Sequence, residues 1–532
     1  MAQILVVKNS LVSGVSAYKY RVVKYLKLLI LLAIMENENH LIKERLKKLE
    51  ELRAQNINPY PYSYKRMHTA AELHEKYSNL KKDEKTKDKT GVCGRIMQLR
   101  RMGKVTFMHL LDESGKIQLY FREDDLKETY GVLKLLDIGD FIGAEGKVFT
   151  TKTGELSVWI EKFEVLCKAF RHLPEKYHGI QDIELRYRQR YLDLLMNPDV
   201  KELFIKRSRI VRAMREFLDS EGFMEVEVPI LQPIYGGAKA RPFVTHINEW
   251  DMKLFLSISP ELYLKRLIVG GYEKVYTICK NFRNEGVDQS HNPEFTMMEC
   301  YWAYVDYEAI MELTERMVEF ICKQVLGTTV ISVKGEMIDL KTPWKRITMK
   351  DAIKTHLKID VDKLSDEALR KVLIDNRIEY EGEFSRGIAI MVLFEGLVED
   401  KLRGPVHITD HPKESTPLCK PKRGNQELIE RFESYILGTE FTNGYSELND
   451  PVLQRRLLEE QAEQLRGGSD EAHPMDEDFI QAIEVGMPPC GGLGLGVDRL
   501  VVFLTGAEGI RDVIFFPTMR PEGDGSETER EQ

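Results

Sequence analysis

Residues 282–286 read Phe-Arg-Asn-Glu-Gly, and residues 291–299 read His-Asn-Pro-Glu-Phe-Thr-Met-Met-Glu. The apolar run Val275–Ile278 precedes them, and a second apolar run ends near Tyr301. Two such runs, separated by a polar loop that contains glycine, predict a strand, a loop and an antiparallel strand. Arg283 and Glu299 then project from neighbouring strands, below a loop that can close over a ligand.

Two residues of this stretch carry distinctive chemistry. The planar guanidinium of Arg283 can pair with two oxygens at once, which suits a phosphate group. The ring of Phe295 offers a flat apolar face of the kind that stacks on a base. The alternative is a surface hairpin with an exposed ion pair, which is common and contributes little. The stretch by itself leaves both interpretations open.

Composition sets wider limits. The chain has 532 residues, 43% hydrophobic and 30% charged, which allows two or three globular domains. The formal net charge is −8, so nucleic-acid binding would have to use local basic patches. The seven cysteines include no CxxC pair, which argues against a zinc ribbon or a disulfide framework and favours the cytoplasm. No apolar run approaches the length that spans a bilayer.

Three segments together resemble the signature motifs of class II aminoacyl-tRNA synthetases. Gly222–Pro229 resembles the first motif, Phe282–Gly286 the second and Gly494–Leu500 the third. Three motifs in the family's order are far more specific than any one of them. The resemblance implies an α+β protein, in which an N-terminal OB-fold β-barrel precedes a catalytic domain with an antiparallel sheet flanked by helices. It also implies a homodimer, because the first motif packs against its partner in this class.

The N-terminal part divides into a leader and a helical region. Residues 1–34 contain basic residues and no acidic one. They are interpreted either as an upstream extension ahead of Met35, which we favour, or as an organelle-targeting peptide. Residues 35–89 are interpreted as a helical region and a linker. The helix predicted at Leu41–Ala54 has one apolar face and one basic face, so it either packs on the next domain or contacts the tRNA backbone.

Residues 90–170 carry short alternating runs with turn signals, which predict a small barrel. In this position the barrel resembles the OB-fold anticodon-binding domain of the lysine, aspartate and asparagine subgroup. The resemblance implies that Phe107 stacks on an anticodon base and that Gln118 hydrogen-bonds to one. A barrel-core Phe and a surface Gln are the alternatives. The glutamate that reads the central base in the family falls, by spacing, at Lys162 beside Glu161, and its counterpart stays unassigned.

The catalytic domain is predicted at residues 189–520, after a hinge at 171–188. Residues 330–410 carry a mixed helical pattern without a class II motif, which predicts a helical insertion of unknown role. Residues 521–532 are rich in Gly, Ser and Glu and are predicted to be disordered.

The resemblance also assigns the ATP and metal contacts. Joining a carboxylate to the α-phosphate of ATP needs positioning and charge neutralisation more than a protein nucleophile. Arg283 would contact the α-phosphate, Arg499 the far end of ATP, and Phe295 would stack under adenine. Glu433 and Glu440 would hold Mg²⁺, about three ions per site, because carboxylate oxygens suit this ion. The remaining ATP contacts would lie in the loop of the second motif: Glu285, His291 and Asn292.

The candidate amino-acid pocket is rich in carboxylates. Pro260–Arg266 (PELYLKR) and Asn443–Leu448 (NGYSEL) resemble the lysine-specific enzymes of this class. Glu447 would meet the side-chain ammonium, since a buried ammonium needs a paired carboxylate. An aspartate-specific pocket would need a cation at that position. The predicted lysine-binding residues are Gly237, Glu261, Glu299, Tyr301, Asn443, Tyr445 and Glu447.

These features predict an ATP-dependent enzyme that activates L-lysine as an adenylate and transfers it to the 3′ end of its tRNA. Two alternatives belong to other functions. A paralogue that transfers lysine to a protein would lack the barrel. A catalytically inactive tRNA-binding paralogue would not need the intact charged residues of the second and third motifs.

Overall fold

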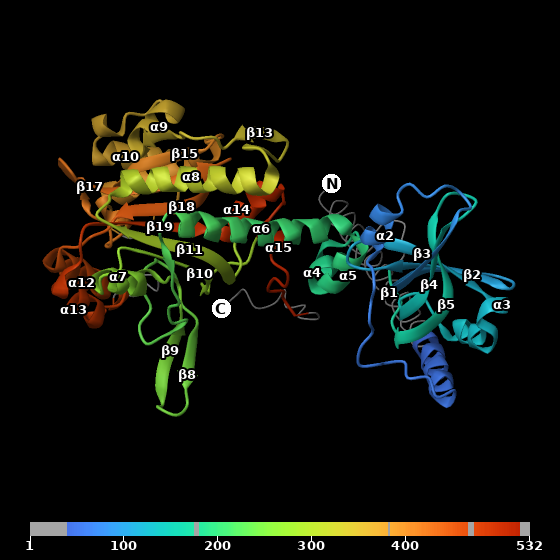
Figure 1. Cartoon of the computed structure of the whole chain (residues 1–532). Helices are drawn as coiled ribbons and strands as arrows, with labels where there is room; N and C mark the ends of the chain where they lie inside the picture. Colours follow the sequence, from blue (N-terminus) through green and yellow to red (C-terminus); the bar gives the residue numbers. More distant parts are fainter. Residues whose placement is uncertain (1–39, 175–179, 381–382, 467–472, 522–532) are drawn as a thin grey trace, which may run out of the picture. The chain divides into compact units, whose positions relative to one another are not determined.

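The structure is a computed structural model and describes residues 40–174, 180–380, 383–466 and 473–521. The chain divides into two compact units, residues 1–177 and 178–532 (Figure 1). The predicted leader lies outside the described residues, as does the predicted tail beyond residue 521. Among the described helices, none is both long enough and apolar enough to cross a membrane.

The first unit is built on a barrel. Its elements are a helix at residues 40–54, α2 (Ala70–Lys76), β1 (Lys85–Met102), β2 (Val105–Leu111), β3 (Lys116–Arg122), α3 (Glu123–Leu126), the 3₁₀ helix η1 (Lys127–Leu135), β4 (Phe141–Thr150) and β5 (Leu156–Cys167). The strands close in the order β1-β2-β3-β5-β4. Burial alternates along β2, so Met108 and Leu110 point into the core whereas Phe107 and His109 lie on the outer face.

The second unit contains longer helices and a large sheet. Its helices are α4 (Ile183–Arg188), α5 (Arg190–Met196), α6 (Pro198–Ser220), α7 (Glu261–Val269), α8 (Tyr307–Leu326), α9 (Met349–Leu357), α10 (Asp366–Asp375), α11 (Arg386–Leu397), α12 (Pro451–Arg466), α13 (Glu477–Gly486), α14 (Val497–Thr505) and α15 (Ile510–Val513). Its short 3₁₀ helices are η2 (Val361–Lys363), η3 (Glu399–Lys401) and η4 (Lys413–Ser415). The predicted hinge therefore includes the helix α4.

The strands of the second unit are β6 (Met224–Glu225), β7 (Leu231–Gln232), β8 (Val244–Ile247), β9 (Met252–Leu256), β10 (Lys274–Phe282), β11 (Glu294–Ala303), β12 (Val330–Val333), β13 (Glu336–Asp339), β14 (Lys345–Thr348), β15 (Val406–Pro412), β16 (Pro421–Lys422), β17 (Asn425–Ile436), β18 (Thr439–Ser446) and β19 (Cys490–Gly496). The central nine-stranded sheet follows the order β14-β15-β17-β18-β19-β11-β10-β6, with β16 paired to β17. The strands β10 and β11 pair antiparallel, as the opening stretch predicts.

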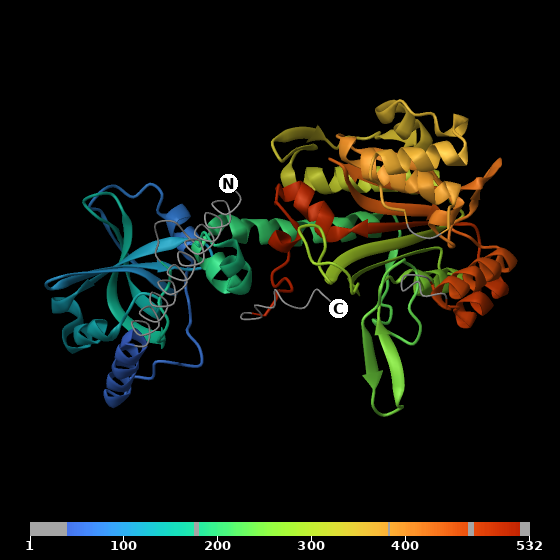
Figure 2. The ribbon, with the colours of Figure 1, turned by 180° about the vertical axis from the view of Figure 1, so that it is seen from behind.

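Two long helices cover this sheet and bury its apolar side chains. α6 begins at Pro198, where a proline suits the first helical position, and α8 ends before Gly327, whose φ of 72° favours glycine. The helices run side by side along the sheet (Figures 1 and 2). Their apolar faces meet sheet residues such as Met298 and Leu495 in one core cluster.

The stretch at 330–410 is only partly helical. It holds α9, α10 and α11, but also the hairpin β12–β13 and the strands β14 and β15, which extend the central sheet beyond β17. The prediction of a helical insertion was wrong for these strands. Every residue of β15 is buried, so the alternation that marks a strand in a sequence is missing.

Candidate active site

The second unit contains a cavity of about 410 Å³. Its walls come from the strands β11, β17, β18 and β19 and from the helices α7, α11 and α14. Every residue that the sequence predicted to bind lysine, ATP or a metal lines this one cavity. These residues are Gly237, Glu261, Arg283, Glu285, His291, Asn292, Phe295, Glu299, Tyr301, Glu433, Glu440, Asn443, Tyr445, Glu447 and Arg499.

Arg283 lies next to Phe295. It directly follows β10, and its amide donates to the backbone oxygen of Pro293 (2.9 Å), which closes the base of the loop between β10 and β11. The guanidinium carbon lies 5.1 Å from the centre of the Phe295 ring. Nε is buried without a hydrogen-bond partner among the described residues. Burial lowers the pKa of Arg283, but a guanidinium stays charged, so the cavity holds a fixed positive charge with an unused donor.

Arg499 lies in the first turn of α14. It donates from Nη1 to the backbone oxygen of Glu440 (2.7 Å) and to its Oε2 (3.3 Å). The preceding residue, Asp498, accepts from the amide of Thr296 (2.7 Å) and pairs with Arg207 (2.6 Å). Asp498 therefore ties the start of α14 to β11, which places Arg499 beside Glu440.

The loop between β10 and β11 is stabilised by its own polar groups. Glu285 and His291 are exposed at the cavity wall, and Nδ1 of His291 lies 2.9 Å from Oδ2 of Asp288. Asn292 is buried, and its Nδ2 donates to the backbone oxygen of Glu294 (2.6 Å). The side-chain nitrogen of Asn292 thus shapes the loop, whereas Glu285 and His291 face the cavity from exposed positions.

Glu433 on β17 and Glu440 on β18 are the predicted metal ligands. Arg431 pairs with Oε1 of Glu433, and the hydroxyl of Tyr435 donates to its Oε2 (2.7 Å). Burial raises the pKa of Glu440, and the charge of Glu433 raises it further. The two carboxylates come from paired strands and line one cavity, and the charge of one disfavours the charged form of the other, so a hard divalent cation suits this site. No group of three or more His, Cys, Asp or Glu in the described ranges could hold a metal by itself.

A further carboxylate, Glu395 on α11, also lines the cavity. Burial and then the charge of Glu433 raise the pKa of Glu395 to about 7. The sequence predicted no role for this residue, because it lies in the stretch without a class II motif. The structure shows that this stretch contributes to the wall of the cavity.

Three other carboxylates form the predicted lysine pocket: Glu261, Glu299 and Glu447. Each is at most 4% exposed. Ser259 donates to Oε1 of Glu299 (2.9 Å), and the hydroxyl of Tyr301 donates to its Oε2 (3.3 Å). Burial raises the pKa of Glu299 to about 8 and that of Glu447 to about 8. Three buried carboxylates are costly unless cations approach them, so the pocket is prepared for positive charge.

Two glycines make room for these carboxylates. Gly237 has a φ of 86°, and a Cβ there would lie 2.7 Å from Oγ of Ser259. A Cβ at Gly492 would lie 2.0 Å from Oε1 of Glu447. Any other residue would push into the pocket at either position.

Arg431 orients two further predicted residues. Its Nε donates to Oδ1 of Asn443 (3.2 Å), and its guanidinium carbon lies 5.8 Å from the centre of the Tyr445 ring. The sequence did not single out Arg431, because its contacts with Asn443 and Tyr445 join the neighbouring strands β17 and β18.

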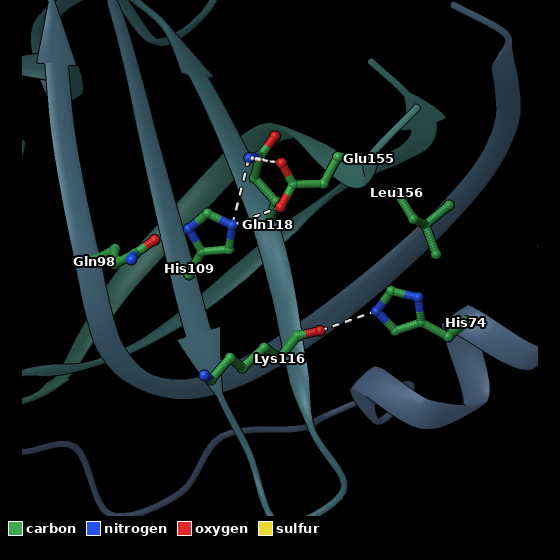
Figure 3. Close-up of a pocket in the computed structure, with 7 residues that line it drawn as sticks. All are labelled: His74, Gln98, His109, Lys116, Gln118, Glu155 and Leu156. Carbon is green, nitrogen blue, oxygen red and sulfur yellow. Dashed lines mark hydrogen bonds and ion pairs between the residues drawn. The ribbon is translucent and has the colours of Figure 1, made fainter. Parts of the chain in front are cut away.

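The barrel carries a second, smaller pocket of about 260 Å³, lined by His74, Gln98, His109, Lys116, Gln118, Glu155 and Leu156 (Figure 3). Gln118 is 7% exposed, and its Nε2 donates to Oε2 of Glu155 (2.6 Å). The hydroxyl of Ser157 donates to Oε1 of Gln118 (2.9 Å). Nε2 of His109 lies 2.6 Å from Oε1 of Glu155. Gln118 is therefore a partnered pocket residue rather than an exposed surface one.

Phe107 lies two residues before His109 on the same outer face of β2. Its ring centre lies 5.2 Å from that of Tyr120, and it is half-buried. Phe107 is therefore not a fully buried core residue of the barrel, and it shares the outer face of β2 with the pocket residue His109.

The comparison with known proteins assigns the second unit. Residues 182–520 match the family described as tRNA synthetases class II (D, K and N). The chain belongs to this family. Residues 91–166 match the OB-fold nucleic acid binding domain. The predicted fold class, an N-terminal OB-fold barrel followed by a class II synthetase domain, is confirmed.

Curated relatives of this class II synthetase carry the name lysine–tRNA ligase. That of Clostridium novyi (strain NT) is 50% identical over 489 residues, 91% of this chain and 95% of the relative. That of Clostridium botulinum (strain Loch Maree / Type A3) is 50% identical over 493 residues, 92% and 97% of the two chains. That of Carboxydothermus hydrogenoformans is 50% identical over 487 residues, 91% and 98%.

The sequence missed the carboxylate of the synthetase's barrel pocket. Spacing pointed to Lys162 and Glu161, but Glu161 pairs with Lys147 (2.7 Å) and Lys89 (3.4 Å). The pocket carboxylate is Glu155, which lies before β5 and reaches residues of β2 and β3. The alternation of β2 could have indicated His109, since it shares the outward face of Phe107.

Proposed function

We propose that this class II synthetase is a cytoplasmic lysine–tRNA ligase. It activates L-lysine with ATP to lysyl-adenylate and then transfers the lysyl group to the 3′ end of tRNA(Lys). The observation that carries the substrate assignment is the set of three buried carboxylates, Glu261, Glu299 and Glu447, in the cavity that also holds Arg283. Lysine brings two ammonium groups and one carboxylate, which match acceptors and a cation in this cavity.

In the first step a carboxylate oxygen of lysine attacks the α-phosphorus of ATP. The bond between this phosphorus and the oxygen that bridges the α- and β-phosphates breaks, and the β- and γ-phosphates leave together as pyrophosphate. Arg283 would hold the lysine carboxylate and the α-phosphate together, because its guanidinium can donate to both. Its half-buried position, with Nε shielded from solvent, strengthens this interaction because water screens it less than at the surface. Phe295 would hold the adenine by stacking, and Arg499 would neutralise charge at the other end of ATP.

The carboxylates of Glu433 and Glu440 fit Mg²⁺, because they lie in the same cavity and repel each other. Bound there, Mg²⁺ would neutralise phosphate charge and orient the leaving pyrophosphate. Arg431 and Tyr435 would fix the orientation of Glu433 through their contacts with its two oxygens.

In the second step the terminal ribose hydroxyl of tRNA attacks the carbonyl carbon of lysyl-adenylate, and AMP leaves. The barrel would select the tRNA by its anticodon. Phe107 would stack on an anticodon base, and Gln118 with its neighbour Glu155 would hydrogen-bond to one. Because Gln118 already donates to Glu155, a base must share or replace that bond.

The active form is proposed to be a homodimer that uses the first motif. Exposed apolar residues lie in and directly after this segment: Met224 (41% exposed), Ile230 (43%) and Leu231 (51%). A cluster of exposed apolar side chains is typical of a protein interface. Analytical ultracentrifugation should give the mass of two chains, and a monomer at micromolar concentration would contradict this proposal.

The substrate assignment is tested by ATP–pyrophosphate exchange with each standard amino acid. Lysine should support exchange well above every other standard amino acid, including arginine, and also above the shorter non-standard analogue ornithine. A preference for a neutral or acidic amino acid would refute the assignment.

The Glu447→Gln variant tests the pocket itself. It keeps the shape of the side chain and removes the charge, so lysine loses its charge-assisted partner. Such a loss costs about 2–5 kcal/mol for a buried pair. We expect kcat/KM for lysine to fall steeply while KM for ATP stays nearly the same. Glu447→Asp should give a milder loss with unchanged specificity. Activation of lysine at the parental rate by Glu447→Gln would place the pocket elsewhere.

A further inference from the structure

A lysine of the chain itself lies against the proposed lysine pocket. Lys265 belongs to α7, one turn after Glu261, so the two side chains share one helix face. The side chain of Lys265 is fully buried. Its Nζ lies 2.6 Å from Oε1 of Glu261, 2.5 Å from Oε2 of Glu447 and 3.5 Å from the backbone oxygen of Leu418. These three acceptors match the three donors of an ammonium group.

The ammonium group of Lys265 has three oxygen partners, whereas the carboxylate of Glu447 still lacks hydrogen-bond donors. Glu261 and Glu447 line the cavity, whereas Lys265 is not among the described residues that line it. Oε2 of Glu447 forms an ion pair with Lys265, but neither oxygen of this buried carboxylate has a hydrogen-bond partner in the described part of the chain, and Oε1 has no ion pair either. An unpartnered buried carboxylate oxygen is costly, and it marks the point where a donor from a ligand is missing.

The charges of the pocket also match one class of ligand. The pocket holds three carboxylates, those of Glu261, Glu299 and Glu447, and one ammonium group, that of Lys265. A bound lysine adds two ammonium groups, and its carboxylate is paired with Arg283 outside this set. Three carboxylates then face three ammonium groups. Without the charge of Lys265 one carboxylate would be in excess and would take up a proton.

We propose that Lys265 is a specificity-determining positioning residue of the synthetase. It holds Oε2 of Glu447 so that Oε1 faces the substrate, and it sets the charge of the pocket so that a doubly cationic amino acid balances it. The proposal rests on the lysine pocket described above. Lys265 acts through Glu447 and Glu261 and does not itself contact the substrate.

The first test is Lys265→Met, which keeps the length and removes the charge. KM for lysine in ATP–pyrophosphate exchange should rise about 30-fold or more, because the variant removes one charge from a set of buried ion pairs. The rate at saturating lysine should change by less than about ten-fold, because Arg283 and the ATP contacts remain. The preference for lysine over its ε-hydroxy analogue should fall at least about ten-fold, since a protonated Glu447 accepts a hydroxyl as readily as an ammonium.

The second readout is the pH profile of KM for lysine. Burial, opposed by Lys265, raises the pKa of Glu447 to about 8, so the empty pocket is protonated at neutral pH. Bound ammonium groups lower that pKa, so binding releases protons. KM of the parent should fall as pH rises from 6.5 to 8, by about ten-fold per pH unit for each proton released. In Lys265→Met this fall should move to higher pH.

Several groups face Glu447 and share this titration. They are Lys265 and Glu261 on α7, Glu299 and Tyr301 on β11, Tyr445 on β18, Cys419, and Cys490 on β19. Of these, Lys265 alone lowers the pKa of Glu447 as a fixed cation. A displacement of the pH profile therefore reports the loss of that charge, which a simple packing defect would not produce.

The third test restores the charge balance. Lys265→Met combined with Glu261→Gln removes one cation and one anion together, which also lowers the cost of an unpaired buried charge. KM of this double variant should lie below that of Lys265→Met, although Glu261→Gln alone raises KM. The double variant also keeps the proposal testable if Lys265→Met does not fold.

Lys168→Met is a matched control, because Lys168 in the first unit is also a fully buried lysine that pairs with two carboxylates. It should lower thermal stability without changing KM for lysine or its pH profile. An unshifted pH profile in Lys265→Met, or a KM of the double variant above both single variants, would refute the role of Lys265. If Glu447→Gln also left KM unchanged, the pocket itself would be refuted instead.

Discussion

Among the described residues of this synthetase, two lysines are fully buried between pairs of carboxylates, one in each unit. Lys168, directly after β5, lies 2.5 Å from Asp137 and 2.8 Å from Asp140. Lys265 on α7 lies at similar distances from Glu261 and Glu447. The local arrangement is nearly the same, but the hydrogen bonds beyond it differ.

In the barrel the network closes on the protein. Asp140 accepts from the amides of Ala169 (2.8 Å) and Asp137 (2.8 Å), and Asp137 also pairs with Lys48 (2.5 Å). Burial would raise the pKa of Asp137, but Lys168 and Lys48 outweigh it and hold the pKa below its ordinary value.

In the catalytic unit the network stays open. Oε1 of Glu447 has no partner among the described residues, and burial raises the pKa of Glu447 to about 8 despite Lys265. Each network contains a buried ammonium, so burial alone does not distinguish them. The difference is whether the second carboxylate oxygens are satisfied by the chain. A closed network stabilises a fold, whereas an open one is arranged for a ligand.

The largest expected effect sharpens this comparison. Lys168→Met leaves the buried Asp140 and the half-buried Asp137 with less compensation, and breaking one side of a buried pair costs about 3–5 kcal/mol. The midpoint of denaturant unfolding of the barrel should fall clearly. Pyrophosphate exchange should stay at the parental level, because that reaction does not use the barrel. Unchanged stability would mean that the closed network does not stabilise the barrel.

Arg283→Ala tests the cavity of the catalytic unit, where polar groups lack partners within the described chain. Arg283 is half-buried, but its Nε is a buried donor without a partner among the described residues, as Oε1 of the buried Glu447 is an acceptor without one. If Arg283 neutralises charge at the α-phosphate, its loss should raise the barrier to adenylate formation by about 3–4 kcal/mol. The folded variant should show pyrophosphate exchange reduced by orders of magnitude, with circular dichroism unchanged. Near-parental exchange in a folded protein would remove Arg283 from the proposed catalytic set.

These two networks also show what the sequence could and could not predict. The positions of Arg283, Glu433 and Glu447 follow from motifs that are contiguous in the chain. Lys265 follows Glu261 by one helical turn, so their contact was predictable in principle. Its contact with Glu447 was not, because it joins α7 to the end of β18 through the tertiary fold.

The same limit explains the other misses. Glu395 lines the cavity from a stretch that lacks a motif. The strand β15 in the same stretch was not predicted, because all its residues are buried and the sequence shows no alternation. Glu155 reaches Gln118 across strands that are distant in the chain. Patterns along the chain identify elements and motifs, but contacts between elements depend on strand register, which the sequence does not state.

The smallest expected effect concerns the outer face of the barrel. Phe107 is half-buried and its ring contacts that of Tyr120, so the residue is partly packed and partly free. If the free side stacks on an anticodon base, Phe107→Ala should raise KM for tRNA in aminoacylation by the loss of about 1–3 kcal/mol of stacking. Pyrophosphate exchange, which needs no tRNA, should be unchanged. Phe107→Tyr keeps the flat face and should restore most of the tRNA affinity, which a specific core-packing role would not predict. A fall in melting temperature with unchanged KM for tRNA would make Phe107 a packing residue of the barrel. Phe107 would then resemble Lys168, which contributes to the stability of the barrel and not to ligand binding.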